Sequence, residues 1–315
     1  MHFRAENPFC SHNLLKIKTL KKCFFYQKKC RTFAENFKTY IIMKKIIFCL
    51  ALTTLFLTTA CNKKAQQNSD TVAIEPTSDF INVDFENFVF DENVEESRVK
   101  VHVYADIPKA DNDALKKIRN SVIDFIYKKG DTPKEAFNNY AKSCVAYFAI
   151  TPDDFSDDFS DDPMMHSEIF DSITPTIVNQ YFIQYCNNNY TYGAGAAHEM
   201  YGIGYYIFDL ETGNRLEEKD VFTNTKKIEN LLKTEGYQNY LKDAGLSESE
   251  TDIQKSSIVV NENFGVTSTD LLYQYNPYEI TCYAEGAPLF RISKESVKPY
   301  LKKGTAIYKY WFGEE

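Results

Sequence analysis

The residues with the most reactive side chains are few and widely spaced in this sequence. His198 follows a glycine-rich break at residues 193–197 and lies twelve residues after Cys186. A cysteine and a histidine can act as nucleophile and base, but this spacing is common in any chain and no third residue supports the pair. The stretches Gly193-Ala194-Gly195 and Gly202-Ile203-Gly204 each lack the third glycine of a dinucleotide-binding loop, and P-loop, GxSxG and HExxH motifs are missing from the sequence. We therefore predict no catalytic residue, no cofactor-binding residue and a protein that is not an enzyme.

An acidic repeat is the most tempting metal-binding candidate. Residues 153–162 read Asp-Asp-Phe-Ser-Asp-Asp-Phe-Ser-Asp-Asp. A calcium-binding loop needs alternating oxygen ligands, a turn glycine and a distal glutamate, which this repeat lacks. Dense like charges are typical of a solvated loop. Cys144, Cys186 and Cys282 have no zinc-ligand spacing with histidine, so we predict no metal and expect these thiols to be buried.

A short apolar segment predicts export. Met43-Lys44-Lys45 is a basic head, Ile46–Leu57 is a 12-residue apolar run, and small residues lead to Cys61. The run is too short to span a bilayer, which needs about 20 residues, and this arrangement is typical of a bacterial lipoprotein signal. We predict lipidation of Cys61 and attachment to the membrane through that anchor only, in the cell envelope at the periplasm-facing outer membrane.

This segment also divides the chain. The predicted signal peptide comprises residues 43–60. The segment before it, residues 1–42, is predicted to be an upstream extension that is not native. The alternative for this segment is a genuine basic N-terminal arm. Residues 61–85 are polar and without period, which predicts a linker. Two lobes follow, at residues 86–175 and 176–315.

Charge narrows the class of partner. Residues 1–60 hold 11 of the 36 basic and 2 of the 44 acidic residues, which leaves 25 basic and 42 acidic residues and a formal charge of −17. Such a chain disfavours nucleic acid and favours cationic partners.

The first lobe shows clear periodicity. Val99–Ile107 alternates apolar and polar residues, which predicts a strand. Asp111–Lys129 has helical spacing and is followed by Gly130, and a capping sequence at Thr132-Pro133 predicts a second helix reaching about Phe148.

The second lobe is richer in predicted strands. A turn is expected at residues 211–214, a helix at 225–235 closed by Gly236, and a short helix after Ser293. Strands are expected at 177–192, 200–210, 257–264, 271–275, 289–292 and 305–312. Strands in runs with helices set apart predict an α+β fold of two lobes, with antiparallel β-sheets and packed helices.

Aromatic side chains form the candidate binding surface. Tyrosine anchors interfaces and stacks on sugars at low entropic cost, but tyrosine is also a good strand former whose ring packs while its hydroxyl stays wet. His198 likewise has one functional and one structural interpretation. It could contact a ligand with a charge that changes with pH, or it could form a hydrogen bond to the backbone of a turn. The candidate residues are Tyr192, His198, Tyr206, Tyr275 and Tyr278.

A family resemblance supports a binding role. Several runs resemble the RsiV-like extracellular domain family, at residues 190–198, 206–216, 220–222, 275–286 and 296–301. Residues 90–185 are similar to the PdaC-associated domain of that family. The resemblance implies a non-catalytic envelope module of two α+β lobes, which in one branch binds lysozyme.

These observations together predict an exported, membrane-anchored, non-catalytic envelope lipoprotein. It would recognise a cationic protein, such as a lysozyme-like basic protein, or a cell-wall component such as a peptidoglycan fragment. The alternatives are a lysozyme-binding receptor or inhibitor, a cell-wall-acting hydrolase or deacetylase-associated enzyme, and a structural or solute-binding lipoprotein.

Overall fold

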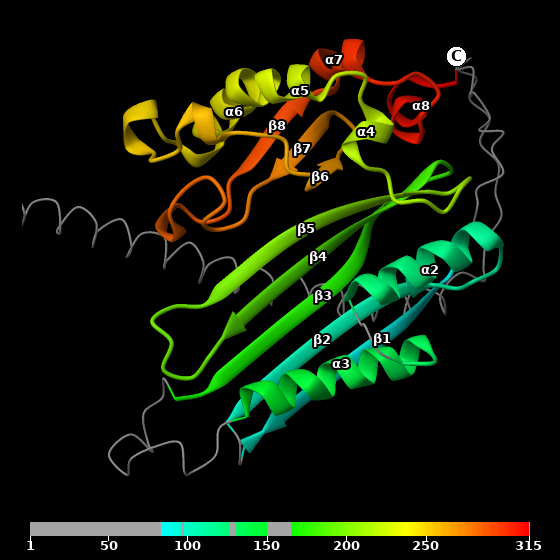
Figure 1. Ribbon diagram of the computed structural model, residues 1–315, viewed down its shortest axis with the longest axis vertical. Coiled ribbons are helices and arrows are strands. Elements are labelled where there is room, and N and C mark those ends of the chain that lie inside the picture. The colour runs from blue at the N-terminus through cyan, green and yellow to red at the C-terminus, as the bar shows by residue number, and fades with distance from the viewer. Residues whose placement is uncertain (1–82, 96–97, 127–129, 150–164, 315) are drawn as a thin grey trace, which may run out of the picture. The chain divides into compact units, whose positions relative to one another are not determined.

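A computed structural model describes residues 83–95, 98–126, 130–149 and 165–314 (Figure 1). The predicted extension, the signal peptide, Cys61, the acidic repeat and most of the linker lie outside the described residues. The described residues all belong to one compact unit. Within the described part of the chain, no helix combines the length and apolar character needed to cross a membrane.

Five strands form the larger sheet, in the order in which they occur along the chain. Neighbouring strands are antiparallel except for the second and third, which are parallel and are joined through two helices. The strands are β1 (Phe85–Val94), β2 (Val99–Pro108), β3 (Ser167–Val178), β4 (Phe182–Tyr192) and β5 (Met200–Asp209).

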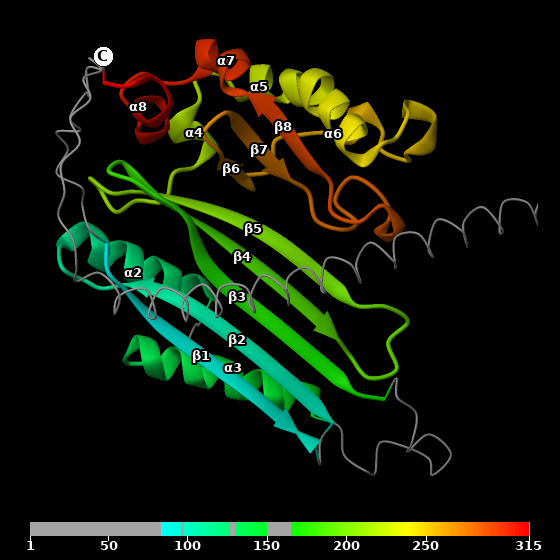
Figure 2. The same ribbon diagram turned by 180° about the vertical axis from the view of Figure 1, so that it is seen from behind.

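Two helices, α2 (Asp113–Ile126) and α3 (Pro133–Phe148), cover one face of this sheet, as the front and back views show (Figures 1 and 2). The strand and helices predicted for the first lobe are confirmed. Alternate valines of β2 are buried, and the Thr132 hydroxyl accepts a hydrogen bond from the backbone N–H of Glu135 at 3.2 Å, which caps α3.

A smaller antiparallel sheet contains β6 (Phe264–Val266), β7 (Asp270–Gln274) and β8 (Leu289–Ser293). Mixed helices and two sheets confirm the predicted α+β class. The helices around the smaller sheet are α4 (Glu218–Val221), α5 (Thr225–Leu231), a π-helical turn (Leu232–Gly236), α6 (Tyr237–Ala244), α7 (Lys294–Val297) and α8 (Ala306–Phe312).

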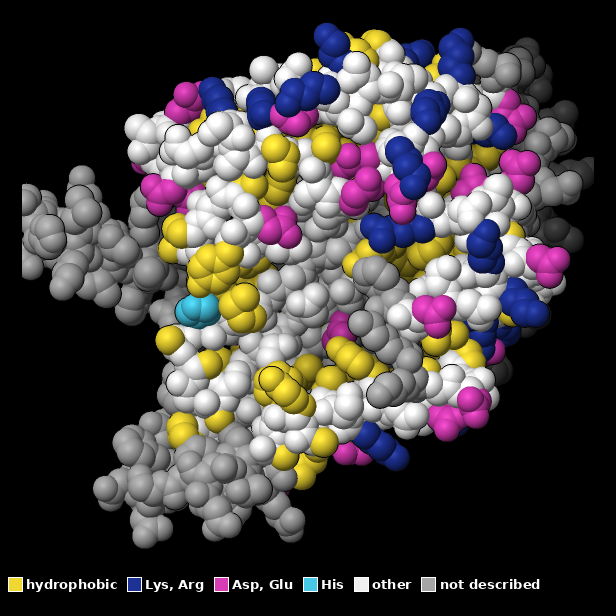
Figure 3. Space-filling model, in the orientation of Figure 1, with side chains coloured by type: hydrophobic (Ala, Val, Ile, Leu, Met, Phe, Trp, Pro, Cys, Tyr) yellow, Lys and Arg dark blue, Asp and Glu magenta, His cyan; other side chains and the backbone are white. Residues whose placement is uncertain are grey.

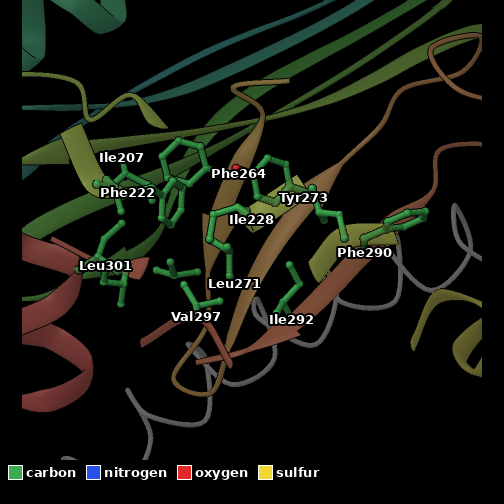
Figure 4. Packing of buried hydrophobic residues seen from close by; sticks show 14 of the residues in the cluster. Ile207, Phe222, Ile228, Phe264, Leu271, Tyr273, Phe290, Ile292, Val297 and Leu301 are labelled. Carbon is green, nitrogen blue, oxygen red and sulfur yellow. The ribbon is translucent and has the colours of Figure 1, made fainter. Parts of the chain in front are cut away.

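Two hydrophobic clusters form the core, and β4 contributes to both. Ile183 packs with the side chains beneath α2 and α3, whereas Phe182 packs with the smaller sheet. Figure 4 shows how Ile207 of β5 lies in the same cluster as Phe264 and Phe290. Successive strand residues point to opposite faces, so one strand can serve two cores.

The expected lobe boundary therefore needs correction. The boundary between residues 175 and 176 falls inside β3, and β4 and β5 continue the sheet that begins with β1. The periodicity of single strands predicts that they form but does not predict which sheet they join. The predicted linker likewise overlaps the start of the fold, because β1 begins at Phe85.

The last predicted strand is a helix. The Thr305 hydroxyl accepts a hydrogen bond from the backbone N–H of Tyr308 at 3.4 Å and begins α8. Trp311 is buried and its Nε1 donates to the carbonyl of Thr267 at 2.8 Å. Aromatic and β-branched residues favour strands only weakly, and burial of one helical face here overrides that preference.

Gly236 does not end a helix. Its φ of −59° is helical, and the chain continues through α6 to Gly245, whose φ of 66° is left-handed and closes the segment. A Cβ at Gly236 would lie 3.4 Å from the Cβ of Phe290, an ordinary van der Waals contact, so the packing on β8 leaves room for a small side chain at this position. The predicted strand at 257–264 is also wrong, because β6 begins only at Phe264.

The cysteines divide into two kinds. Cys144 and Cys186 are buried free thiols, as expected, but the prediction of burial is wrong for Cys282, which is exposed. Cys282 lies just before a short 3-10 turn at the surface, where its side chain joins no core.

A buried glutamine joins the two sheets. Gln184 of β4 is 2% exposed, its Oε1 accepts from the backbone N–H of Val266 at 2.6 Å, and its Nε2 donates to the carbonyl of Val266 at 3.2 Å. One side chain of the larger sheet thus forms hydrogen bonds with both the backbone N–H and the backbone C=O of Val266 in β6.

Replacing this glutamine by an apolar residue of similar size tests the joint. We expect Gln184→Leu to lower the free energy of unfolding by about 2–4 kcal/mol, because both backbone groups of Val266 lose their partner while buried. Urea denaturation measures the change. Gln238→Leu is the matched control, since Gln238 is exposed and its loss is expected to change stability by less than about 0.5 kcal/mol. Equal effects of the two substitutions would contradict the role of Gln184.

Candidate functional site

A polar pocket of about 260 Å³ lies along the free edge of β5. We call it the asparagine pocket, because five of its lining residues are asparagines from three different segments. Its lining also carries an arginine, two glutamates and two tyrosines. The polar lining residues are Asn187, Asn189, Asn261, Asn263, Asn276, Arg215, Glu262, Glu279, Tyr205 and Tyr206.

Two glycines of β5 open the floor of the pocket. A Cβ at Gly204 would lie 2.7 Å from the hydroxyl oxygen of Tyr206, and a Cβ at Gly202 would lie 3.0 Å from Oδ1 of Asn189. The separation at Gly204, which belongs to the lining, is too short for a side chain unless the Tyr206 ring moves, and that at Gly202 is tight. The glycines thus leave space for neighbouring side chains to lie across the strand. The Gly-Ile-Gly sequence therefore allows these side chains to pack over β5.

Side-chain amides complete the edge of β5. Oδ1 of Asn276 accepts from the backbone N–H of Ile203 at 2.8 Å. Asn263 donates to the carbonyl of Ile203 at 2.8 Å and accepts from the backbone N–H of Tyr205 at 2.9 Å. These amides take the place of a neighbouring strand and attach the wall of the pocket to its floor.

Arg215 and Tyr206 form a stacked pair in the pocket. The guanidinium carbon of Arg215 lies 4.8 Å from the centre of the Tyr206 ring, and its Nη2 donates to the carbonyl of Glu262 at 3.4 Å. Burial raises the pKa of Tyr206 to about 12, although the charge of Arg215 opposes the shift. The phenol is therefore neutral at physiological pH, and the pair contributes one hydroxyl and one guanidinium to the lining.

The two glutamates have different roles. Glu262 exchanges hydrogen bonds with Glu218, each carboxylate accepting from the other residue's backbone N–H at 2.9 Å, so it holds the wall of the pocket. Glu279 is exposed and accepts from Nδ2 of Asn261 at 3.1 Å. No histidine, cysteine, serine or threonine is among the described residues of the lining, and the described residues contain no acidic, histidine or cysteine group suited to a metal ion. The pocket is equipped for hydrogen bonding.

A buried carboxylate supports the floor from behind. Asp171 of β3 is 7% exposed, accepts from the Tyr140 hydroxyl at 2.6 Å and accepts from Nδ2 of Asn187 at 2.8 Å. Burial raises the pKa of Asp171, although the hydrogen bonds from Tyr140 and Asn187 oppose the shift. Asn187 is thus held in a fixed orientation where it lines the pocket.

Beside the pocket, four rings form what we call the aromatic cluster: His198, Tyr201, Tyr278 and Tyr283. The His198 ring stacks on Tyr283 with a centroid distance of 4.0 Å, and its Nε2 lies 3.3 Å from the Tyr278 hydroxyl. Tyr201 meets Tyr283 edge-on at 5.9 Å. The cluster joins the start of β5 to the loop between β7 and β8.

The structure separates the predicted surface residues into three groups. Tyr206 lines the asparagine pocket, while His198 and Tyr278 meet in the aromatic cluster although 80 residues separate them. Tyr192 is buried against His166, and Tyr275 is buried with its hydroxyl donating to the carbonyl of Val259 at 2.7 Å. The last two tyrosines therefore pack in the fold and do not face a ligand.

Sequence reasoning missed the asparagines. Each stands in a polar stretch or a strand where a single amide is unremarkable, and Asn276 precedes a proline in what reads as a turn. The one available signal was the number of asparagines among residues 187–189 and 261–276, which the fold brings to a single edge.

Comparison with known proteins places part of the chain in a family. Residues 219–295 match the family described as "Protein of unknown function (DUF3298)", so the chain contains a DUF3298 domain. This match covers the asparagine pocket's wall and the loop that carries Tyr278. No curated protein matches the sequence significantly.

Two solved structures resemble the fold. A member of the DUF3298 family from Bacteroides fragilis NCTC 9343 matches over 74% of this chain and 98% of its own length, with a TM-score of 0.59 and 19% sequence identity. A DUF3298 family protein from Pseudomonas aeruginosa PAO1 covers 70% of this chain and 93% of its own, with a TM-score of 0.47 and 14% identity. The first supports the α+β fold, and the narrower RsiV-like resemblance stays a prediction.

The raised pKa of Asp171 gives a test of the floor. The native state holds this proton to higher pH than the unfolded chain, so stability falls as pH rises from about 4 through the raised native pKa. The variant Asp171→Asn lacks the titrating carboxyl group and so lacks this loss of stability. The free energy of unfolding of the variant minus that of the wild type should therefore increase with pH, by at most about 1.4 kcal/mol per pH unit. Urea denaturation of both proteins between about pH 4 and about pH 7 measures it. A difference that stays constant with pH would exclude the buried carboxylate as described.

Proposed function

We propose that this protein is an exported, lipid-anchored and non-catalytic binding protein whose asparagine pocket holds an uncharged polar unit of a cell-wall component, such as a sugar of a peptidoglycan fragment. The observation that carries the proposal is the lining of the pocket. Amides, a guanidinium, two carboxylates and phenol hydroxyls meet at one edge of the sheet, and the described lining contains no serine, threonine, cysteine or histidine.

The balance of charge favours an uncharged ligand. Arg215, Glu262 and Glu279 all line the pocket, so its charged groups are of both signs and favour neither an anionic nor a cationic ligand. Amide groups both donate and accept hydrogen bonds, which suits hydroxyl and acetamido groups. The volume of about 260 Å³ lies below the roughly 300–1,000 Å³ of sites for drug-sized ligands, so one sugar unit fits better than a large compound.

The arrangement of the carboxylates favours binding over hydrolysis. Glycoside hydrolases place two carboxyl groups on either side of the scissile bond, one of them free to donate a proton. Here Glu262 accepts a hydrogen bond from the Glu218 backbone and serves the wall, which leaves Glu279 alone. We therefore propose that the protein holds its ligand unchanged.

Export and anchoring rest on the sequence pattern ending at Cys61. An acyl anchor at this residue would keep the binding domain beside the cell wall, within reach of glycan strands. Such an anchor would bring the proposed saccharide pocket to a compartment where cell-wall saccharide is abundant.

A cationic protein is the second candidate partner, favoured by the formal charge of −17 for residues 61–315. The face with the pocket carries acidic and basic side chains interspersed, without a large patch of one sign (Figure 3). Electrostatic steering of a basic protein to this face would be weak, so the cell-wall component is the preferred ligand.

Asn189 tests the pocket, because it is exposed, lines the pocket and serves no backbone group of another segment. We expect Asn189→Ala to weaken the binding of a soluble peptidoglycan fragment about tenfold in calorimetric titration, which corresponds to the loss of about one hydrogen bond. Asn188→Ala is the matched control, since Asn188 points to the opposite face of β4 and its Nδ2 lies 3.5 Å from the Cys186 sulfur.

Three results would reject the proposal. Equal losses in the two asparagine variants would show that the pocket is not the site. Selective binding of lysozyme that survives a several-fold increase over about 150 mM salt would favour the cationic-protein partner. Release of cleaved or deacetylated product from the fragment would make the protein an enzyme.

A further inference from the structure

The asparagine pocket and the aromatic cluster share two segments of backbone. In the turn after β7, Asn276 and Glu279 line the pocket, and Tyr278 between them belongs to the cluster. In β5, Ile203 lines the pocket, and Tyr201, two residues before it, belongs to the cluster. Asn189 and Gly204 of the pocket lie on the other face of the sheet, so the two features are neighbours through the turn at residues 276–279, at the edge of β5.

The rings of the cluster are held in fixed positions. Nδ1 of His198 lies 2.8 Å from the Glu199 carbonyl and must donate to it, so in the neutral ring Nε2 accepts from the Tyr278 hydroxyl at 3.3 Å. Stacking on Tyr283 orients the imidazole further. Rings that are already ordered lose little freedom when a ligand packs on them.

Tyr278 is exposed at a position that the fold alone would not assign to tyrosine. Its side chain is 57% exposed, and its φ of 72° lies in the left-handed region that favours glycine or asparagine. Neither burial nor backbone conformation explains a large ring there. A ligand that packs against the ring would explain it.

We propose that the aromatic cluster is a second saccharide subsite, so that the protein binds an oligosaccharide with one sugar in the asparagine pocket and the next ones across Tyr278 and His198. This inference rests on the proposed function and adds selectivity for chain length. The pocket supplies hydrogen bonds to hydroxyl and acetamido groups, while exposed rings supply a flat surface for the C–H face of a pyranose.

An oligosaccharide fits this surface better than a peptide or a protein does. A polar pocket directly beside flat, exposed rings matches a ligand whose units each carry a hydroxylated edge and an apolar face. A peptide of the cell wall is charged at its carboxylates, and the pocket already presents Glu279 to it.

The test is a titration of the full chain with neutral β-1,4-linked N-acetylglucosamine oligomers, from the single sugar to the tetramer. We expect affinity to rise at least tenfold from the monomer to the trimer. Tyr278→Asn should abolish this increase while leaving the affinity for the monomer unchanged, since asparagine tolerates the left-handed backbone and the pocket is intact. Asn189→Ala should weaken every length by a similar factor.

Two further variants separate a subsite from a structural effect. His198→Ala should reduce the length dependence in the same way as Tyr278→Asn. Tyr147→Ala is the control, because Tyr147 is 82% exposed on α3 and belongs to neither feature. Retained affinity for the monomer shows that each variant is folded.

Distinct results overturn the two proposals. Monomer binding with no gain for longer oligomers, or an equal loss for all lengths in Tyr278→Asn, would reject the second subsite and leave the pocket standing. Failure of the wild-type protein to bind any oligomer, or binding only of a cell-wall tetrapeptide, would reject the saccharide pocket and the second subsite together.

Discussion

The free edge of β5 is the constraint on which the rest of this structure depends. An edge strand exposes unpaired N–H and C=O groups, and these must find partners or attract another chain. Here two partners come from the DUF3298 segment, because Asn276 and Asn263 bond the backbone of Ile203 and Tyr205. A third comes from the chain before that segment, where the backbone N–H of Leu216 donates to the carbonyl of Ile207 at 2.8 Å. The second sheet is attached to the first through these bonds.

This way of closing an edge also explains the pocket. A partner strand would have filled the space beside β5 with backbone, whereas single amides bond the edge at separate points and leave a hollow between them. Because the joining groups are polar, the hollow is lined by polar atoms. Gly204, where a Cβ would clash with the Tyr206 hydroxyl, and Arg215 are among its other lining residues. The binding function that we propose therefore uses the same groups that hold the two sheets together.

Part of the candidate site was visible in the sequence as aromatic residues. Tyr206, His198 and Tyr278 were singled out by type, and they do lie near one edge of the sheet. Tyr192 and Tyr275 were singled out by the same criterion but are buried. Residue type cannot separate these cases, because tyrosine in a strand faces either way and the packing of a second layer decides which face is covered.

The sequence by itself determined the local elements whose residues repeat clearly: the alternating valines of β2, the amphipathic α2, the capped α3 and the turn at residues 211–214, where the Gly213 N–H donates to the Asp209 carbonyl at 2.8 Å. Only the tertiary structure decided that β4 and β5 join the first sheet, that residues 306–312 are helical and that five asparagines meet at one edge. The physical reason is range. Periodicity and capping act over a few residues, whereas these features depend on contacts between segments far apart in the chain, such as Asn276 with Ile203.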